Sequence, residues 1–316
     1  MRSRVILEKE PIDPLSAAWM KELRTHNCTR AEYAVDPYAE VYRFREGVYG
    51  ILKESADGMG APWMYLIDGP EKAMLIDTGF GIGDLKGLVE QIIGKKPLIV
   101  VCTHAHFDHC YGNCQFDKVY CHEYEAPYME LKQDSHIWDY LFDENGKPIW
   151  YDFDQRDIVP YRRYEIVPCP DGYVFDLGGD HQVELVHLAG HSAGHAGYLD
   201  KKNRILFCGD DFVSMRVGIG MKREGMPYRE YCSVHAFYEA VKRLSCRLDE
   251  FDVLFPGHFI VEIESRVVND MLSVLQRIED DPGHYDFEAK NYRGVLNRYC
   301  YVNGLGLLAF TKETVR

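Results

Sequence analysis

The sequence predicts an α/β protein in which β-sheets are covered by helices. Short apolar segments recur along the chain, and most end at Gly, Pro, Asp or Asn, which is typical of buried strands. Segments with apolar residues at helical spacing follow, mainly in the second half. Strands first, and then strands mixed with helices, favour this class over an all-α or all-β protein.

The predicted strands share a length of three to five residues and a high content of Val, Leu, Ile, Phe and Tyr. They are residues 64–68, 73–77, 98–102, 118–121, 183–187, 204–208 and 253–255. The first two are separated by "GPEK", which is typical of a hairpin connection. The segment "RGVLNRYCYVNGLGLLAF" at 293–310 also has the pattern of paired strands.

Three segments are predicted helices, at 84–94, 233–248 and 264–280. Each carries apolar residues three or four positions apart, and Ser233 is a candidate N-cap of the second.

Two stretches, 123–165 and 212–232, are longer than ordinary connections. Long loops in compact domains are often lids or binding loops, and a surface insertion or an oligomer contact is an equal alternative for each. The first stretch is rich in aromatic residues that could form an apolar pocket wall or a core of its own. They are Trp138, Tyr140, Phe142, Trp150, Tyr151 and Phe153.

Composition limits the partners and the location. The 36 Lys and Arg residues against 50 Asp and Glu residues leave a net charge of −14, which disfavours nucleic acid. Ten cysteines without a CxxC pair favour reduced thiols in the cytoplasm. The N-terminal "MRSRVILEKEPIDPL" has too short an apolar run for a signal peptide, and no segment is apolar enough to span a membrane.

The segment "CTHAHFDHC" at 102–110 concentrates metal-binding side chains. His104, His106, Asp108 and His109 follow directly after a predicted strand, at the end where ligands bind in α/β proteins. Imidazole nitrogens and carboxylate oxygens are good ligands for zinc and similar divalent ions. The cluster therefore predicts a metal site.

Three later segments repeat the pattern of an apolar strand, a small turn residue and a metal-binding side chain. "LAGHSAGH" supplies His191, "LFCGDD" supplies Asp210, and "LFPGHF" supplies His258. Together with the first cluster this makes seven candidate ligands. Seven are too many for one tetrahedral ion, but they suit two ions that share a bridging carboxylate.

The ordered set HxHxDH, His, Asp, His resembles the metallo-β-lactamase-fold superfamily, in particular its glyoxalase II-like and lactonase-like members with a full dinuclear ligand set. "LIDTGFG" at 75–81 resembles the strand and turn that precede the metal motif in this family. The resemblance implies a four-layer αββα sandwich. It also implies a single domain over 1–316 with a core at about 45–280, the two insertions, and N- and C-terminal extensions.

The resemblance also implies roles for individual residues. His104, His106 and His191 would bind the first ion, Asp108, His109 and His258 the second, and Asp210 would bridge them. Asp211 is the alternative bridge, while Asp77 and His195 would be structural. Cys102, Cys110 and Cys208 lie beside ligand positions and are expected to be small packing residues. Zinc is favoured for both ions, and iron or manganese is also compatible with these ligands.

The implied reaction is hydrolysis by a hydroxide that bridges the two ions, with Asp108 orienting this nucleophile. His106 replaces the Glu of oxygen- and nitric oxide-reducing relatives, which disfavours redox chemistry. Asp210 is a bridge that β-lactamases generally lack, which disfavours β-lactamase activity. "GHFI" at 257–260 differs from the "GHEY" of glyoxalase II, so the resemblance to that enzyme is partial. Val213 replaces the Tyr of homoserine-lactone hydrolases, which weakens the resemblance to those enzymes.

We therefore expect a hydrolase of a small-molecule ester, thioester or lactone. A phosphodiesterase is the alternative, a non-catalytic scaffold or a β-lactamase is disfavoured, and a homodimer is compatible with the sequence.

Overall fold

The computed structural model describes residues 28–53, 56, 61–150, 153–220, 222–291 and 294–316. These residues form two compact units. The first unit comprises residues up to 120 with 129–167 and 176–181, and the second comprises 121–128, 168–175 and 182–316. The N-terminal "MRSRVILEKEPIDPL" and Tyr151 lie outside the described residues, and the single-domain organisation stays a prediction.

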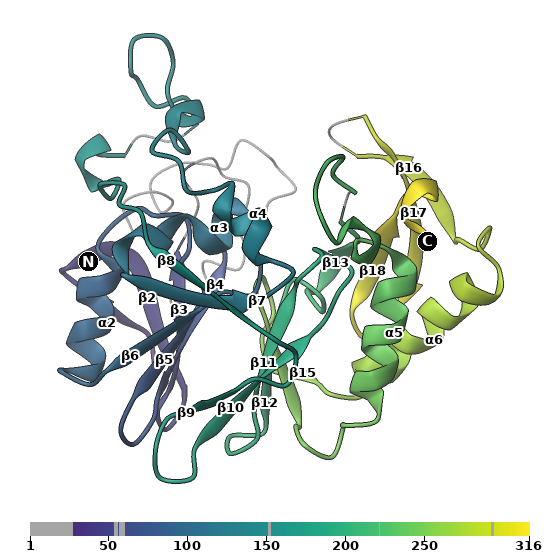
Figure 1. Ribbon diagram of the computed structural model, residues 1–316, viewed down its shortest axis with the longest axis horizontal. Helices are drawn as coiled ribbons and strands as arrows, with labels where there is room; N and C mark the ends of the chain where they lie inside the picture. Colours follow the sequence, from purple (N-terminus) through teal and green to yellow (C-terminus); the bar gives the residue numbers. More distant parts are fainter. Residues whose placement is uncertain (1–27, 54–55, 57–60, 151–152, 221, 292–293) are drawn as a thin grey trace. The chain divides into compact units, whose positions relative to one another are not determined.

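The first unit is built on an eight-stranded sheet whose strands follow each other in chain order (Figure 1). Strands β1 to β5 pair antiparallel, whereas β5, β6 and β7 are parallel. The "GPEK" connection between β4 and β5 is the predicted hairpin. The strands are β1 (Ala31–Tyr33), β2 (Asp36–Arg45), β3 (Val48–Lys53), β4 (Trp63–Asp68), β5 (Ala73–Ile76), β6 (Leu98–Val101), β7 (Lys118–His122) and β8 (Glu165–Cys169).

Helix α2 (Leu85–Ile93) is the helix predicted at 84–94 from its apolar spacing. It connects the parallel strands β5 and β6. The Asp84 side chain accepts a hydrogen bond of 2.8 Å from the Gly87 N–H and so caps the first turn. Because β5 and β6 are parallel, their carboxyl ends lie at the same edge of the sheet. The segments that follow them, starting at Asp77 and Cys102, therefore leave from this edge.

The second unit contains a six-stranded sheet with the order β15-β14-β12-β11-β10-β9. Strand β11 pairs antiparallel with β10 and β12, and β12 pairs parallel with β14, so β10, β12 and β14 run in the same direction. The three predicted ligands of this unit follow those three strands. The strands are β9 (Val174–Asp176), β10 (Gln182–His187), β11 (Ala196–Asp200), β12 (Ile205–Gly209), β14 (Val253–Pro256) and β15 (Ile263–Glu264).

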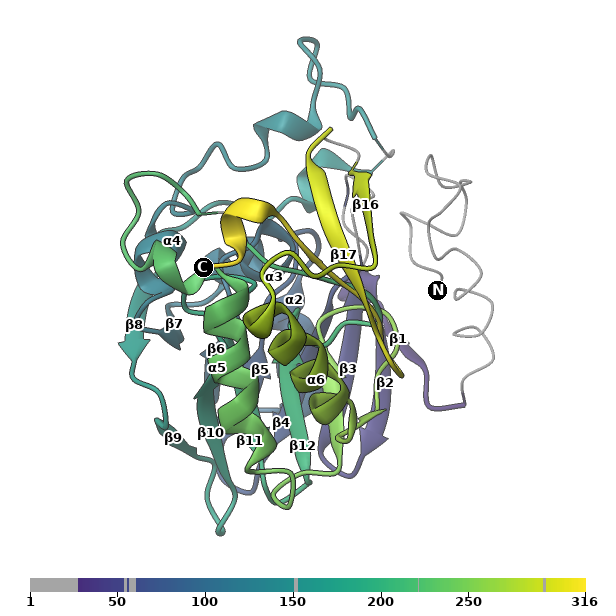
Figure 2. The same ribbon diagram turned by 90° about the vertical axis from the view of Figure 1, so that its right-hand side faces the viewer.

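Helices α5 (Val234–Ser245) and α6 (Val267–Asp280) lie side by side in the second unit (Figure 2). Ser233 is the N-cap of α5, as predicted: its Oγ accepts a hydrogen bond from the Ala236 N–H. Helix α6 begins three residues later than predicted, since Ile263–Glu264 pair with β14 instead. Buried residues of both helices share one apolar core with the sheet, including Phe237, Val241, Met271, Leu206 and Leu254.

A four-stranded sheet with the order β13-β18-β17-β16 completes the second unit. The predicted strand pair at 293–310 is confirmed by β17 (Leu296–Val302) and β18 (Gly306–Phe310), which are antiparallel. Strand β13 (Met215–Gly218) comes from the 212–232 stretch and pairs parallel with β18, and β16 (Phe287–Lys290) pairs with β17. The 212–232 stretch is therefore partly a sheet element.

The 123–165 stretch contains helix α4 (Ala126–Glu130) and two short 3-10 turns, η2 (Asp139–Leu141) and η3 (Gln155–Asp157). Trp138 is buried and donates a hydrogen bond of 3.0 Å to the Phe80 carbonyl, whereas Tyr140 and Trp150 are exposed. One aromatic residue thus anchors the stretch while others face solvent.

The predicted α/β class is confirmed. All seven predicted strands coincide with observed ones. Within the described residues, no helix combines the length and apolar character that crossing a membrane requires.

Candidate metal centre

The segment 102–110 changes from extended chain to helix at His106. This residue has an extended backbone (φ −76°, ψ 150°) and precedes the short helix α3 (Phe107–Cys110). His104 and His106 therefore leave the end of β6 from extended chain, while Asp108 and His109 leave from the first helical turn. His104, Asp108 and His109 are buried.

The imidazoles of His104 and His106 contact each other. His104 Nε2 lies 2.9 Å from His106 Nδ1, and His104 Nδ1 lies 3.0 Å from Thr103 Oγ1. Two nitrogen ligands of a tetrahedral zinc ion are about 3.3 Å apart, since each lies 2.0–2.1 Å from the metal. The separation of the two nitrogens is thus close to that of two ligands of one ion.

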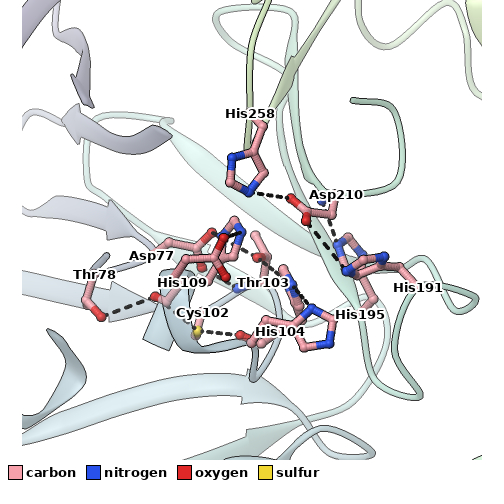
Figure 3. Close-up of polar contacts among 12 residues, drawn as sticks. Asp77, Thr78, Cys102, Thr103, His104, His109, His191, His195, Asp210 and His258 are labelled. Carbon is pink, nitrogen blue, oxygen red and sulfur yellow. Dashed lines mark hydrogen bonds and ion pairs between the residues drawn. The ribbon is translucent and has the colours of Figure 1, made fainter. Parts of the chain in front are cut away.

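Asp77 connects His109 to Thr103 (Figure 3). Its Oδ2 lies 2.9 Å from His109 Nδ1 and accepts a hydrogen bond of 2.8 Å from the Thr103 hydroxyl, while its Oδ1 accepts one of 2.7 Å from the Thr103 N–H. Because a carboxylate accepts hydrogen bonds, Nδ1 of His109 carries the proton and Nε2 keeps its lone pair. Asp108 Oδ2 lies 3.8 Å from this Nε2, so both groups can serve the same ion.

The chain after the motif approaches the end of β5 closely. The Thr78 N–H donates to the His109 carbonyl at 2.9 Å, and the Gly112 N–H donates to the Gly79 carbonyl at 3.0 Å. A Cβ atom on Gly112 would lie 2.1 Å from the Thr78 carbonyl oxygen, so only glycine fits there. This contact holds α3 against the strand end that carries Asp77.

In the second unit, Asp210 lies between two histidines (Figure 3). Its Oδ2 is 3.5 Å from His191 Nε2, and its Oδ1 is 3.6 Å from His258 Nε2. His191 Nδ1 lies 2.7 Å from the Gly218 carbonyl, to which it donates, so its Nε2 lone pair faces Asp210. Burial lowers the pKa of His191, which keeps this imidazole neutral near pH 7. One carboxylate with an oxygen toward each imidazole is the arrangement that a bridging ligand needs.

His195 and Asp211 form a buried pair beside these ligands. His195 Nδ1 lies 2.7 Å from Asp211 Oδ2, and His195 Nε2 accepts a hydrogen bond of 3.0 Å from the Asp210 N–H. Both ring nitrogens of His195 thus contact protein groups, which supports its expected structural role. Asp210 lies beside His191 and His258, whereas Asp211 lies beside His195, and the bridging role of Asp210 stays a prediction.

Each unit therefore brings together its own share of the predicted ligands. His104, His106, Asp108 and His109 gather in the first unit, and His191, Asp210 and His258 gather in the second. All seven are imidazoles or carboxylates, and this donor set fits divalent ions such as zinc, iron or manganese.

Several residues that support these ligands carried no signal in the sequence. Thr103 and the Gly218 carbonyl contact His104 and His191 directly. Glu125 and His187 contact the loop that carries His191. A lone Glu, a lone His and a backbone carbonyl have no characteristic spacing, and only the tertiary contacts show their roles.

Comparison with known proteins assigns the family. The family model of the metallo-beta-lactamase superfamily matches residues 57–258. Among solved structures, a metallo-beta-lactamase from Pontibacter korlensis has a TM-score of 0.52 with 20% identity, covering 75% of this chain and 99% of that one. A beta-lactamase domain protein from Burkholderia ambifaria has a TM-score of 0.53 with 16% identity, covering 76% and 75%. These likenesses confirm the predicted metallo-β-lactamase fold.

Two curated relatives are similar over most of their length. The chain is 28% identical over 233 residues to the acyl-coenzyme A thioesterase MBLAC2 of Homo sapiens, covering 68% of this chain and 78% of the relative. It is 23% identical over 193 residues to the hydroxyacylglutathione hydrolase GloC of Haemophilus influenzae, covering 60% and 82%. Taken with the family match, these relatives show that the chain is a hydrolase that belongs to the metallo-beta-lactamase superfamily.

Proposed function

We propose that this protein is a metal-dependent thioesterase that hydrolyses acyl thioesters of small thiols. The observation that carries the proposal is the complete set of seven imidazole and carboxylate donors in a chain of this superfamily. The two relatives described above support the substrate class, because both names describe removal of an acyl group from a thiol.

In this proposal the seven donors would hold two divalent ions. His104, His106 and His191 would hold one ion, Asp108, His109 and His258 would hold the other, and Asp210 would be shared by both. In His109 and His191, Nδ1 donates a hydrogen bond to a protein oxygen, which leaves the Nε2 lone pair available to a metal ion. These two contacts support the assignment. When bound, such ions supply Lewis-acid chemistry that lowers the pKa of bound water from its bulk value to about 7.

Asp108 is the proposed catalytic residue. Its side chain is 12% exposed, so it is largely buried yet reachable from solvent, and its carboxylate can accept a proton from the attacking water and orient that water. A thiolate leaving group needs little proton donation, since a free thiol has a pKa of about 8.5. One carboxylate therefore suffices for the proton transfers of a thioesterase. Zinc as the native metal and a cytoplasmic location stay predictions.

A parallel hydrolysis assay tests the proposal. The wild-type protein and Asp108→Ala are given acyl-coenzyme A, an acylglutathione, a p-nitrophenyl ester, a lactone and bis-p-nitrophenyl phosphate. We expect the thioesters to be hydrolysed fastest and the activity to disappear in Asp108→Ala, while His136→Ala, a change at an exposed histidine, leaves it unaltered. Preferred cleavage of the phosphodiester, or full activity of Asp108→Ala, would contradict the proposal.

A further inference from the structure

A buried glutamate contacts the loop that carries His191 and His195. Glu125 lies between β7 and α4 and is 1% exposed. Its Oε2 accepts a hydrogen bond of 2.8 Å from the Ser192 hydroxyl and another of 2.8 Å from the Gly194 N–H. Both donors lie in the segment 188–195 between β10 and β11, on either side of Ala193.

The same loop is held at further points. His187 Nε2 donates to the Ala193 carbonyl at 2.9 Å, and the Gly220 N–H donates to the Gly190 carbonyl at 2.9 Å. A Cβ atom on Gly194 would lie 2.1 Å from the Glu125 backbone nitrogen, so the two backbones are in close contact. Each residue from Ser192 to Gly194 therefore has a fixed partner outside the loop.

Packing alone does not explain why a carboxylate is buried at this position. Burying a charged group is unfavourable unless hydrogen bonds compensate, and an apolar side chain would fill the same volume without this penalty. Glu125 directs one oxygen to a side chain and a backbone amide that are not themselves metal donors. Its two hydrogen bonds instead fix the backbone that joins His191 to His195.

We propose that Glu125 is a positioning residue, which sets the direction of the His191 imidazole by fixing residues 192–194. The proposal rests on the proposed function, because it takes His191 to be a metal ligand. The Gly218 carbonyl contacts the His191 ring directly, and Glu125 holds the backbone that follows His191 through Ser192 and Gly194. Loss of Glu125 leaves the Gly194 N–H without this acceptor and frees the loop to move.

The experiment measures metal binding by purified full-length protein. Glu125→Ala, Glu125→Gln, Ser192→Ala and the control Glu123→Ala, at an exposed glutamate two residues away, are compared with wild type. Zinc affinity is measured by competition with a chelator, and the cobalt(II)-substituted proteins are compared by visible absorption. Thermal unfolding of the metal-free proteins monitors folding separately.

Glu125→Ala is expected to weaken the binding of one of the two ions by roughly 10- to 100-fold and to change the cobalt spectrum, as loss of a group that orients a ligand does. Glu125→Gln retains an acceptor oxygen and should restore both readouts, and Ser192→Ala should lie between Glu125→Ala and wild type. Glu123→Ala should match wild type.

Two results overturn the inference in different ways. If wild type binds two ions and Glu125→Ala has the same affinity and spectrum, the inference is wrong and the proposed function stands. If wild type binds no metal, the proposed function fails, and the inference fails with it. Should Glu125→Ala not fold, Ser192→Ala decides, because an unchanged affinity and spectrum in that variant contradict the inference.

Discussion

Asp77 Oδ2 lies 2.9 Å from His109 Nδ1, and the Asp77 carboxylate also accepts two hydrogen bonds from Thr103. Asp77 adopts a left-handed backbone (φ 63°), which is uncommon for a residue other than glycine. A strained backbone at the end of β5 thus directs one carboxylate to two residues of the metal motif. Asp77 determines which nitrogen of His109 is available to a metal ion.

Asp77→Asn is expected to weaken binding of the ion held by His109 by roughly 10- to 100-fold. The amide lacks the negative charge that favours the proton on Nδ1, and only one of its two polar atoms accepts hydrogen bonds. Metal content after dialysis against a chelator measures the effect. Thr78→Val, which removes a hydroxyl that contacts Asn113 and the His109 carbonyl but no ring nitrogen, is the control. Equal metal retention in Asp77→Asn and wild type would contradict this role.

Lys53 and Asp36 form a buried ion pair in the first unit, and Lys53 Nζ also donates to the Ile82 carbonyl at 2.8 Å. Lys53→Met leaves the Asp36 carboxylate buried without its cation, and the free energy of unfolding should fall by about 3–5 kcal/mol. The double variant Asp36→Asn/Lys53→Met removes both charges and should recover most of this loss. Urea unfolding measures both.

The control for this prediction is the exposed pair Lys118–Glu165, whose side chains are 45% and 60% exposed. Lys118→Met should leave the urea midpoint unchanged, because exposed pairs contribute little. A Lys53→Met protein with the midpoint of Lys118→Met would show that the buried pair does not stabilise the fold.

His122 makes the stability of the second unit depend on pH. Burial, with the neighbouring His187, lowers the pKa of His122 from 6.5 to about 3, and the two rings stack at 3.9 Å. Between these pH values the unfolded chain binds a proton that the folded protein does not. The free energy of unfolding therefore falls as the pH drops below 6.5, by at most about 1.4 kcal/mol per pH unit from this residue.

His122→Asn tests this pH dependence, because the amide oxygen can replace Nδ1 as acceptor of the Tyr124 N–H. Urea unfolding of metal-loaded protein at roughly pH 7, 6 and 5 should show a steeper loss of stability for wild type than for the variant. Parallel pH profiles would mean that His122 already titrates normally in the folded protein.

The candidate ligands could be identified because they follow short apolar strands, and strand ends leave a local pattern in the sequence; their binding of metal stays a prediction. The residues that contact the candidate ligands or their loops could not be predicted. Glu125, for example, is 67 residues from Ser192 in the sequence, and such distant pairs leave no local pattern. Strand β2 was not predicted because "DPYAEVYRFR" combines proline and charged residues, and Asp36 and Glu40 are nevertheless buried. Strand β13 was not predicted because its first two residues, Met215 and Arg216, are exposed and do not form an apolar run.

The most direct test of the central claim is the rate of acyl-coenzyme A hydrolysis by purified protein before and after removal of its metal, with metal content measured on the same samples. We expect about two divalent ions per chain, loss of hydrolysis when they are removed, and recovery when zinc is added back. An undiminished rate in protein that retains no metal would contradict the account.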